Sequence, residues 1–88
     1  MRRSLIAGNW KLHGLVENQS WIPALESALA TPPAHDVAVC VPATLITTMA
    51  QTARDWLSVG AQDCSFHSSG AHTCEISSGM LADAGCSH

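Results

Sequence analysis

Charged residues are scarce in this chain of 88 residues. Asp, Glu, Lys and Arg make up 12% of it, about half of the share that a globular domain usually carries. The net charge is −3, and the basic residues Arg2, Arg3, Lys11 and Arg54 form no cluster. Nucleic-acid binding needs a basic patch that neutralises phosphates, so this class of partner is disfavoured. Apolar residues reach 47%, which is enough to drive collapse and argues against disorder.

Long apolar runs are also absent. No segment approaches the roughly 18 apolar residues that a membrane-spanning helix needs, so we expect no membrane partner. Arg2 and Arg3 are followed only by the short run SLIAG, which is too short for a secretory leader. The four cysteines, Cys40, Cys64, Cys74 and Cys86, contain no C-x-x-C pair. This is unlike the disulfide framework of a secreted domain, and we expect a cytoplasmic protein.

The sequence lacks the glycine-rich phosphate-binding motifs and the G-x-S-x-G motif of hydrolases. It contains instead an alternation of apolar strand patterns and helical patterns. We predict strands near residues 4–9, 37–41 and 57–62, and helices near 20–30, 44–54 and 77–84. Such βαβαβα order predicts an α/β fold with a parallel sheet.

Polar residues at the predicted helix ends are typical caps. Ser20 and Thr44 are expected to cap the first two helices, Ser77 the third, and Gly85 to follow the end of the third.

Three strands cannot complete such a fold, because the helices cover only one face. We expect the other face to be uncovered and to carry small and branched residues: Ala7, Gly8, Val39, Val41 and Gly60.

The stretch AGNWKLHG, residues 7–14, holds the only lysine. Lys11 follows the predicted end of the first strand, and ligands of parallel α/β folds bind at that edge. An ammonium there can stabilise negative charge on a substrate oxygen. Asn9 lies one strand period earlier and can donate to the same ligand. The plain alternative is an exposed, solubilising Lys11 and a turn-forming Asn9.

The loop between the third strand and the third helix suggests a second, weaker hypothesis. Cys64, His67, His72 and Cys74 are residue types that bind zinc. Their spacing, C-x2-H-x4-H-x-C, matches no standard zinc module, so we favour a polar loop without metal.

Two blocks of the sequence resemble the triosephosphate isomerase family. AGNWKLHG is similar to the first-strand signature of that family. VGAQDCS and SGAHTCEISSGMLADAGCSH, at residues 59–65 and 69–88, are similar to its third strand, interface loop and following helix. The resemblance covers residues 4–88, although residues 15–56 share mostly pattern.

The resemblance implies the N-terminal βαβαβα portion, about a third, of a (β/α)8 barrel. It implies interconversion of dihydroxyacetone phosphate and glyceraldehyde 3-phosphate, with no cofactor or metal. Lys11 would be catalytic and would bind the phosphorylated triose together with Asn9. Gln62 would contact these two residues and not the substrate. The protein would be a homodimer in which Thr73 and Glu75 reach the partner subunit near its Asn9 and Lys11.

The chain departs from the family in two respects. Cys74 stands where the family usually has glycine, and a positive φ there would strain the cysteine. A barrel of this kind takes roughly 250 residues, and the family's catalytic histidine and general-base glutamate come after the segment matched here. We therefore expect the 88 residues alone to be inactive. The alternative function is a non-catalytic fragment or interaction module that self-associates through open sheet edges, including that of the third strand.

Overall fold

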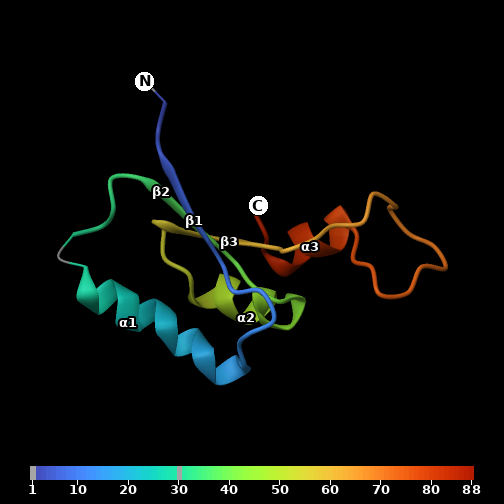
Figure 1. Ribbon diagram of the computed structural model, residues 1–88, viewed down its shortest axis with the longest axis horizontal. Coiled ribbons are helices and arrows are strands. Elements are labelled where there is room, and N and C mark those ends of the chain that lie inside the picture. The colour runs from blue at the N-terminus through green and yellow to red at the C-terminus, as the bar shows by residue number, and fades with distance from the viewer. Residues whose placement is uncertain (1, 30) are drawn as a thin grey trace.

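The computed structural model describes residues 2–29 and 31–88, and helices and strands alternate along them (Figure 1). The elements are β1 (Leu5–Asn9), the 3-10 helix η1 (Val16–Ser20), α1 (Trp21–Ala28), β2 (Asp36–Cys40), α2 (Ala43–Thr52), β3 (Leu57–Gly60) and α3 (Ser78–Ala84). The predicted α/β class is confirmed. Residue 30, the predicted end of the first helix, lies outside the described residues.

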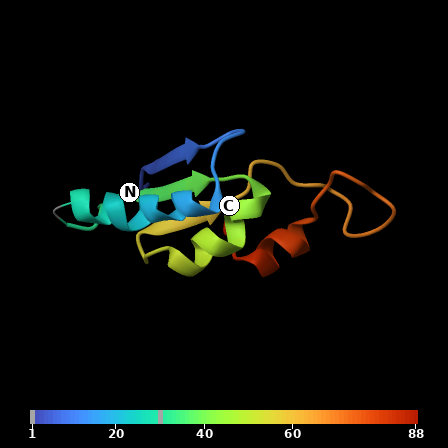
Figure 2. The same cartoon turned by 90° about the horizontal axis from the view of Figure 1, so that it is seen from below.

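The three strands form one parallel sheet in the order β1-β2-β3 (Figure 2). Ala7 pairs with Ala38, and Ala38 pairs in turn with Ser58. Paired residues of neighbouring strands project from the same face, and successive residues of one strand alternate between faces. The pairing therefore determines which side chains share each face: one set projects toward the helices, and the alternate set projects from the opposite face.

The core lies between α2 and the helix-covered face. Leu45, Ile46 and Met49 of α2 are all buried, and Ile22 of α1 and Leu81 of α3 join them. The sheet contributes Val39, Val41, Leu57 and Val59. Figure 1 shows α1 and α2 on one side of the sheet, below it in this view. Burial of each such side chain stabilises the fold by about 1.5–3 kcal/mol relative to exposure. Because α2 has three buried side chains and α1 and α3 have one each, α2 contributes the most to this stabilisation.

The expected composition of the uncovered face is wrong in part. Val39 and Val41 are buried in the helix-covered core, and Gly8 pairs with Val39, which places it on the same side. The reason is the two-residue period of a strand, because adjacent residues such as Ala7 and Gly8 cannot share a face. By register, the uncovered face carries Ala7, Asn9, Ala38, Cys40, Ser58 and Gly60.

The outer edge of β3 is not fully open. The backbone N–H of Ser87 donates to the Val59 carbonyl at 2.9 Å, and the N–H of Ala61 donates to the His88 carbonyl at 2.9 Å. Residues 87–88 thus lie alongside β3 in the place of a further strand. The expected unpaired edge at β3 is wrong at these positions, and β1, whose one partner strand is β2, keeps the free edge in the described part of the chain.

Only the third helix is capped as predicted. Ser77 Oγ accepts a hydrogen bond from Met80 N at 3.2 Å, and Gly85 follows α3 in the left-handed conformation. Ser20 occupies the N-cap position of α1 but its side chain does not cap the helix, because it is also the last residue of η1 and its hydroxyl donates to the Glu17 carbonyl. Thr44 is also wrong, because α2 begins at Ala43 directly after Pro42, whose fixed φ favours a helix start.

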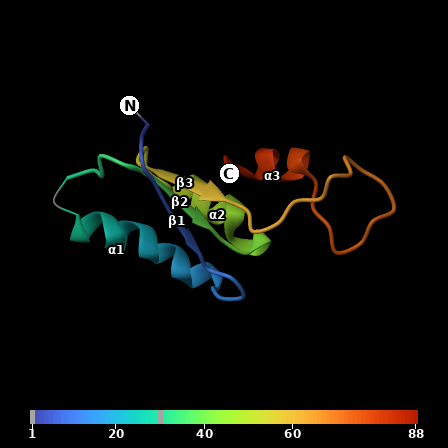
Figure 3. The same cartoon turned by 45° about the horizontal axis from the view of Figure 1, so that its top comes forward.

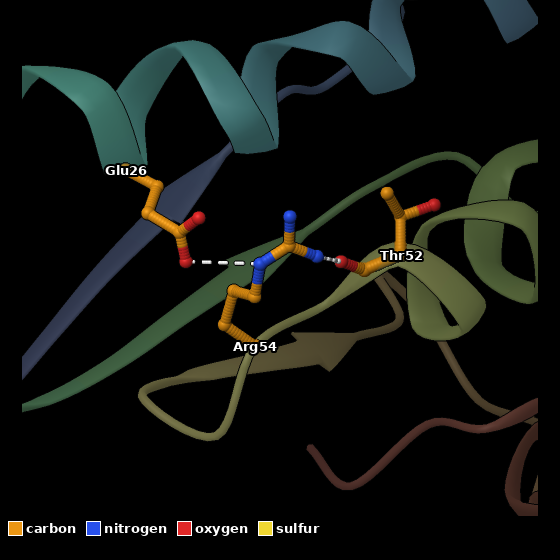
Figure 4. Close-up of polar contacts among 3 residues, drawn as sticks. All are labelled: Glu26, Thr52 and Arg54. Carbon is orange, nitrogen blue, oxygen red and sulfur yellow. Dashed lines mark hydrogen bonds and ion pairs between the residues drawn. The ribbon is translucent and has the colours of Figure 1, made fainter.

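Helix α1 is held less firmly than α2. Ile22 is its one buried residue among those described. A polar link joins its far end to the segment after α2 (Figure 4). Arg54 Nε donates to Glu26 Oε2 at 2.9 Å, and Arg54 Nη1 donates to the Thr52 carbonyl at 2.7 Å. The pair is half-exposed, so we expect it to contribute no more than about 1 kcal/mol.

The molecule is flat. Its extents are 48 × 36 × 20 Å and its radius of gyration is 13.9 Å, compared with about 12 Å for a compact chain of this length. Residues 64–77 contribute to this shape, because they project from the body as a long loop in all three views (Figures 1–3). No helix among the described residues is long and apolar enough to cross a membrane.

Candidate functional site

The candidate site begins where β1 ends. Asn9 is the last residue of β1, and its side-chain Oδ1 accepts a hydrogen bond from the backbone N–H of Lys11 at 2.7 Å. Lys11 has φ of 57°, in the left-handed region that costs a non-glycine residue about 1–2 kcal/mol. Strain of this kind is kept where the surroundings hold it, commonly at functional sites. No feature of the sequence pattern predicted this conformation, because lysine is not a residue typical of it.

Gln62 fixes the same turn from the loop after β3. Its side-chain Nε2 donates to the Lys11 carbonyl at 3.0 Å and to the Cys40 carbonyl at 3.3 Å. The Cys40 carbonyl also accepts from the backbone N–H of Trp10 at 3.0 Å. One amide therefore links segments that follow or end all three strands. The structure brings together three residues that the resemblance assigns to the site: Asn9, Lys11 and Gln62.

The rest of the turn packs on the core. Trp10 is half-buried and meets Trp21 edge to face, with ring centroids 5.7 Å apart. Gly14 has φ of +112°, and a Cβ there would lie 2.8 Å from Leu45 Cδ1 and 2.9 Å from the Trp10 ring. Residue 14 therefore has to be glycine for the turn to close on the core. Trp10 serves packing, which leaves Lys11 as the residue of the turn suited to a ligand.

Charge at the site comes from the Lys11 ammonium. The ion pairs within residues 2–29 and 31–88 join Arg3 to Asp36, Arg54 to Glu26, and His72 to Glu75, so none of them engages Lys11. Its side chain is exposed and free of a neutralising carboxylate in the described structure. An anionic ligand at this edge would meet an uncompensated positive charge.

Thr73 and Glu75 lie on the projecting loop, with contacts of their own. Glu75 Oε1 accepts from Ser65 Oγ at 2.7 Å, and its other oxygen lies 4.0 Å from His72 Nδ1. Cys74 between them has φ of 65°, so the positive φ considered from the sequence is present and strains this residue. The structure does not bring Thr73 or Glu75 into contact with Asn9 or Lys11 of the same chain.

The zinc hypothesis finds no support in the loop. The rings of His67 and His72 stack at a centroid distance of 3.9 Å with an interplanar angle of 11°. Imidazole ligates a metal in its ring plane, and two nearly parallel stacked rings do not converge on one ion. No group of three or more His, Cys, Asp or Glu side chains in the described part of the chain could hold a metal.

Comparisons with known proteins agree on one family. The family model described as Triosephosphate isomerase matches residues 4–88. A triosephosphate isomerase of Jannaschia sp. (strain CCS1) is 48% identical over 89 residues, covering 100% of this chain and 36% of that protein. One from Natranaerobius thermophilus is 40% identical over 86 residues, covering 97% of this chain and 34% of that protein.

A solved structure shows the same likeness in three dimensions. The crystal structure of triosephosphate isomerase from Bartonella henselae superposes with a TM-score of 0.87 at 34% identity, covering 99% of this chain and 36% of that chain. The chain thus spans about a third of the length of the relatives it matches. Sequence and fold together show that it belongs to the triosephosphate isomerase family.

Proposed function

We propose that this chain supplies the Asn9–Lys11 part of an active site that interconverts dihydroxyacetone phosphate and glyceraldehyde 3-phosphate. The observation that carries the proposal is the conformation of Lys11. Its turn is strained and is held at the carboxyl edge of the sheet by two hydrogen bonds, one that the Lys11 N–H donates to Asn9 Oδ1 and one that Gln62 donates to the Lys11 carbonyl. A solubilising lysine would need neither the strain nor the two supports.

The chemistry of this isomerisation suits an ammonium. Removing a proton from the carbon beside a carbonyl places negative charge on the carbonyl oxygen, and a fixed positive group lowers the energy of that state. Lys11 fills this role and also attracts the substrate phosphate. Asn9 uses its Oδ1 on the Lys11 backbone, so its amide N–H groups remain to donate to a substrate oxygen.

The 88 residues alone are proposed to be inactive. General acid–base catalysis needs a positioned group to take the proton and another to return it. The resemblance puts the family's histidine and glutamate at positions that these residues do not include. In this proposal the chain holds the charge-stabilising half of the site and depends on the rest of a barrel for the base.

The partners in this proposal are a phosphorylated triose and a second subunit, with no cofactor, and the setting is the cytoplasm. The exposed, projecting loop of residues 64–77 is the observation that favours a second subunit. Thr73 and Glu75 are exposed and belong to the loop of residues 64–77, which projects from the body of the chain (Figure 1). They could therefore reach another molecule, as the resemblance implies, beside the Asn9 and Lys11 of that molecule.

The test is complementation. The 88-residue chain is mixed with a separately made polypeptide carrying the remaining barrel of a relative, and isomerase turnover is followed in a coupled assay. We expect no turnover from the chain alone and turnover from the mixture. Lys11→Ala should abolish it, because the ammonium is lost. The matched control, Arg2→Ala, removes an exposed cation outside the site and should leave turnover unchanged.

Two results would overturn the proposal. One is turnover by the purified chain that survives Lys11→Ala. The other is a mixture that is active and equally so with Lys11→Ala, since the lysine would then have no part in the chemistry.

The second candidate function, self-association through a sheet edge, rests on β1. All five of its residues are exposed, Leu5 at 53% and Ile6 at 55%, and its outer edge has no partner strand in the described structure. An edge of this kind favours pairing with another chain. Two copies pairing antiparallel about Ala7 would, however, bring Arg3 of one toward Lys11 of the other just beyond the paired residues, and these like charges repel, although Asp36 compensates Arg3 in part.

Sedimentation measures this candidate directly. If β1 pairs with β1, the chain should dimerise at high concentration, and more strongly in high salt, where the repulsion of Arg3 and Lys11 is screened. Ile6→Lys should return it to monomer. A monomer at every salt concentration would remove this candidate without touching the isomerase proposal.

A further inference from the structure

The four cysteines divide into two kinds by their surroundings. Cys40 and Cys86 are half-buried, whereas Cys64 and Cys74 are exposed, and all four are free thiols. The two exposed ones line the same hollow of about 280 Å³. The hollow lies at the base of the projecting loop and is also lined by Ser65 and Glu75. Two exposed cysteines therefore border one small space, and Cys64 also borders a second hollow, of about 380 Å³, with the half-buried Cys86.

Hydrogen bonds hold the two arms of the loop together beside these thiols. The backbone N–H of Ser65, next to Cys64, donates to the Ile76 carbonyl at 2.9 Å. The side chain of the same serine donates to Glu75, next to Cys74, at 2.7 Å. A parallel bridge also pairs Ser65 with Ser77. These contacts form a neck that keeps the arm carrying Cys64 close to the arm carrying Cys74.

We propose that Cys64 and Cys74 are a modification site, a thiol pair that a small disulfide such as glutathione disulfide oxidises to an internal disulfide. The thiolate of one cysteine attacks a sulfur of the small disulfide and releases one glutathione thiolate. The thiolate of the other cysteine attacks the mixed disulfide and releases the second glutathione. The protein loses two protons and two electrons, and the small disulfide is reduced to two thiols.

The pairing is favoured over modification of single thiols. Cys64 and Cys74 span only eleven residues, and the neck already holds their arms together. The second thiol therefore meets the mixed disulfide at an effective concentration of roughly millimolar. Below that concentration of glutathione disulfide, internal closure is faster than a second glutathionylation.

The other two cysteines are poor competitors. Burial, followed by the nearby Cys40, raises the pKa of the Cys86 thiol, and the thiolate is the form that reacts. Cys40 is half-buried at the end of β2. Cys64 and Cys74 are already exposed, so their reaction with a small disulfide needs no local unfolding.

Cleavage of the chain can separate the proposed thiol pair from the other two cysteines, so its oxidation can be measured by mass. The purified chain is incubated with glutathione disulfide below millimolar concentration and quenched in acid. It is then cut at Arg54 with trypsin and at Met80 with cyanogen bromide. The fragment 55–80 contains Cys64 and Cys74 and neither of the other cysteines. We expect its mass to fall by two hydrogen atoms, with recovery after reduction.

Single substitutions separate a pair from two independent thiols. In Cys64→Ser or Cys74→Ser the remaining thiol has no partner, so fragment 55–80 should gain one glutathione instead of losing two hydrogens. Cys40→Ser and Cys86→Ser are the matched controls and should leave the loss of two hydrogens unchanged. Two glutathiones on fragment 55–80 of the unsubstituted chain, or no change in its mass, would overturn the proposal.

Discussion

β1 and β2 are neighbours in one sheet, yet they differ in how the chain supports them. β2 holds two buried residues, Val39 on its helix-covered side and Ala38 on the opposite face. All five residues of β1 are exposed. The helices contribute unequally, because α2 packs against β3 and α3 packs against α2, while α1 adds one buried side chain, Ile22. The molecule thus consists of a packed part and a thinly covered edge.

The candidate site lies on the thinly covered edge. Asn9 and Lys11 end and follow β1, but the groups that hold their turn come from the packed part. The Cys40 carbonyl accepts from Trp10 N, and Gln62 donates to the Lys11 carbonyl. The packed part therefore stabilises the fold, and these few hydrogen bonds fix the conformation of the turn at the site.

The largest expected effect comes from the packed part. Leu45→Ala removes a side chain that is 1% exposed at the centre of the core, and we expect a loss of about 2–5 kcal/mol in the free energy of unfolding. Leu12→Ala removes the same atoms from a side chain that is 96% exposed, and should change it by less than about 0.5 kcal/mol. Urea unfolding followed by circular dichroism measures both. Equal losses would mean that the edge is as well packed as the core.

Two glycines give the next comparison. A Cβ at Gly60 of β3 would lie 2.9 Å from Cys40 Sγ and 3.0 Å from the His88 carbonyl, whereas at Gly8 of β1 it would meet nothing within 4 Å. Gly60→Ala should therefore cost about 1–3 kcal/mol through overpacking, and Gly8→Ala should be neutral or slightly stabilising. Thermal unfolding distinguishes them. Adding Cys40→Ala to Gly60→Ala should recover part of the loss, and no recovery would show that the backbone contact dominates.

The packed part was the easier one to predict from the sequence. The alternation of apolar runs predicted the α/β order, and Ser77 and Gly85 marked the ends of α3 because their signals are local. Ser20 and Thr44 were incorrectly expected to cap helices with their side chains. The 3-10 helix η1 leads directly into α1, and Pro42 precedes the first residue of α2. The assignment of Val39 and Val41 to the uncovered face ignored the alternation of the strand.

Their place at the end of the first strand indicated Asn9 and Lys11 as candidate site residues, whereas Gln62 was indicated only by the family resemblance. Nothing in the residue types indicates that Lys11 takes a left-handed conformation, because it depends on Gln62, 51 residues away. A contact of that sequence separation is set by how β1 and β3 flank β2. The stacked His67 and His72 rings were similarly hidden, since the spacing that suggested zinc does not reveal how two rings face each other.

Gln62 gives a smaller effect that is local to the edge. Gln62→Leu keeps most of the side-chain volume but removes the donor to the Lys11 and Cys40 carbonyls, and one such bond contributes about 0.5–1.5 kcal/mol. We expect faster amide exchange at residues 10–12 with little change in α2. The matched control, Gln51→Leu on the exposed side of α2, should leave residues 10–12 unchanged. Exchange that rises equally throughout the chain would contradict a local role.

The smallest effect is expected at the ion pair that ties α1 to the packed part. Arg54 and Glu26 are 40% and 44% exposed, and a pair so accessible to water contributes only about 0.2–1 kcal/mol. A double-mutant cycle with Glu26→Gln and Arg54→Met measures their coupling, which should shrink as salt is raised. Arg54 also donates to the Thr52 carbonyl, so Arg54→Met alone should cost more than Glu26→Gln alone. A coupling well above 1 kcal/mol that resists salt would mean that this link, more than the burial of Ile22, holds α1 to the sheet.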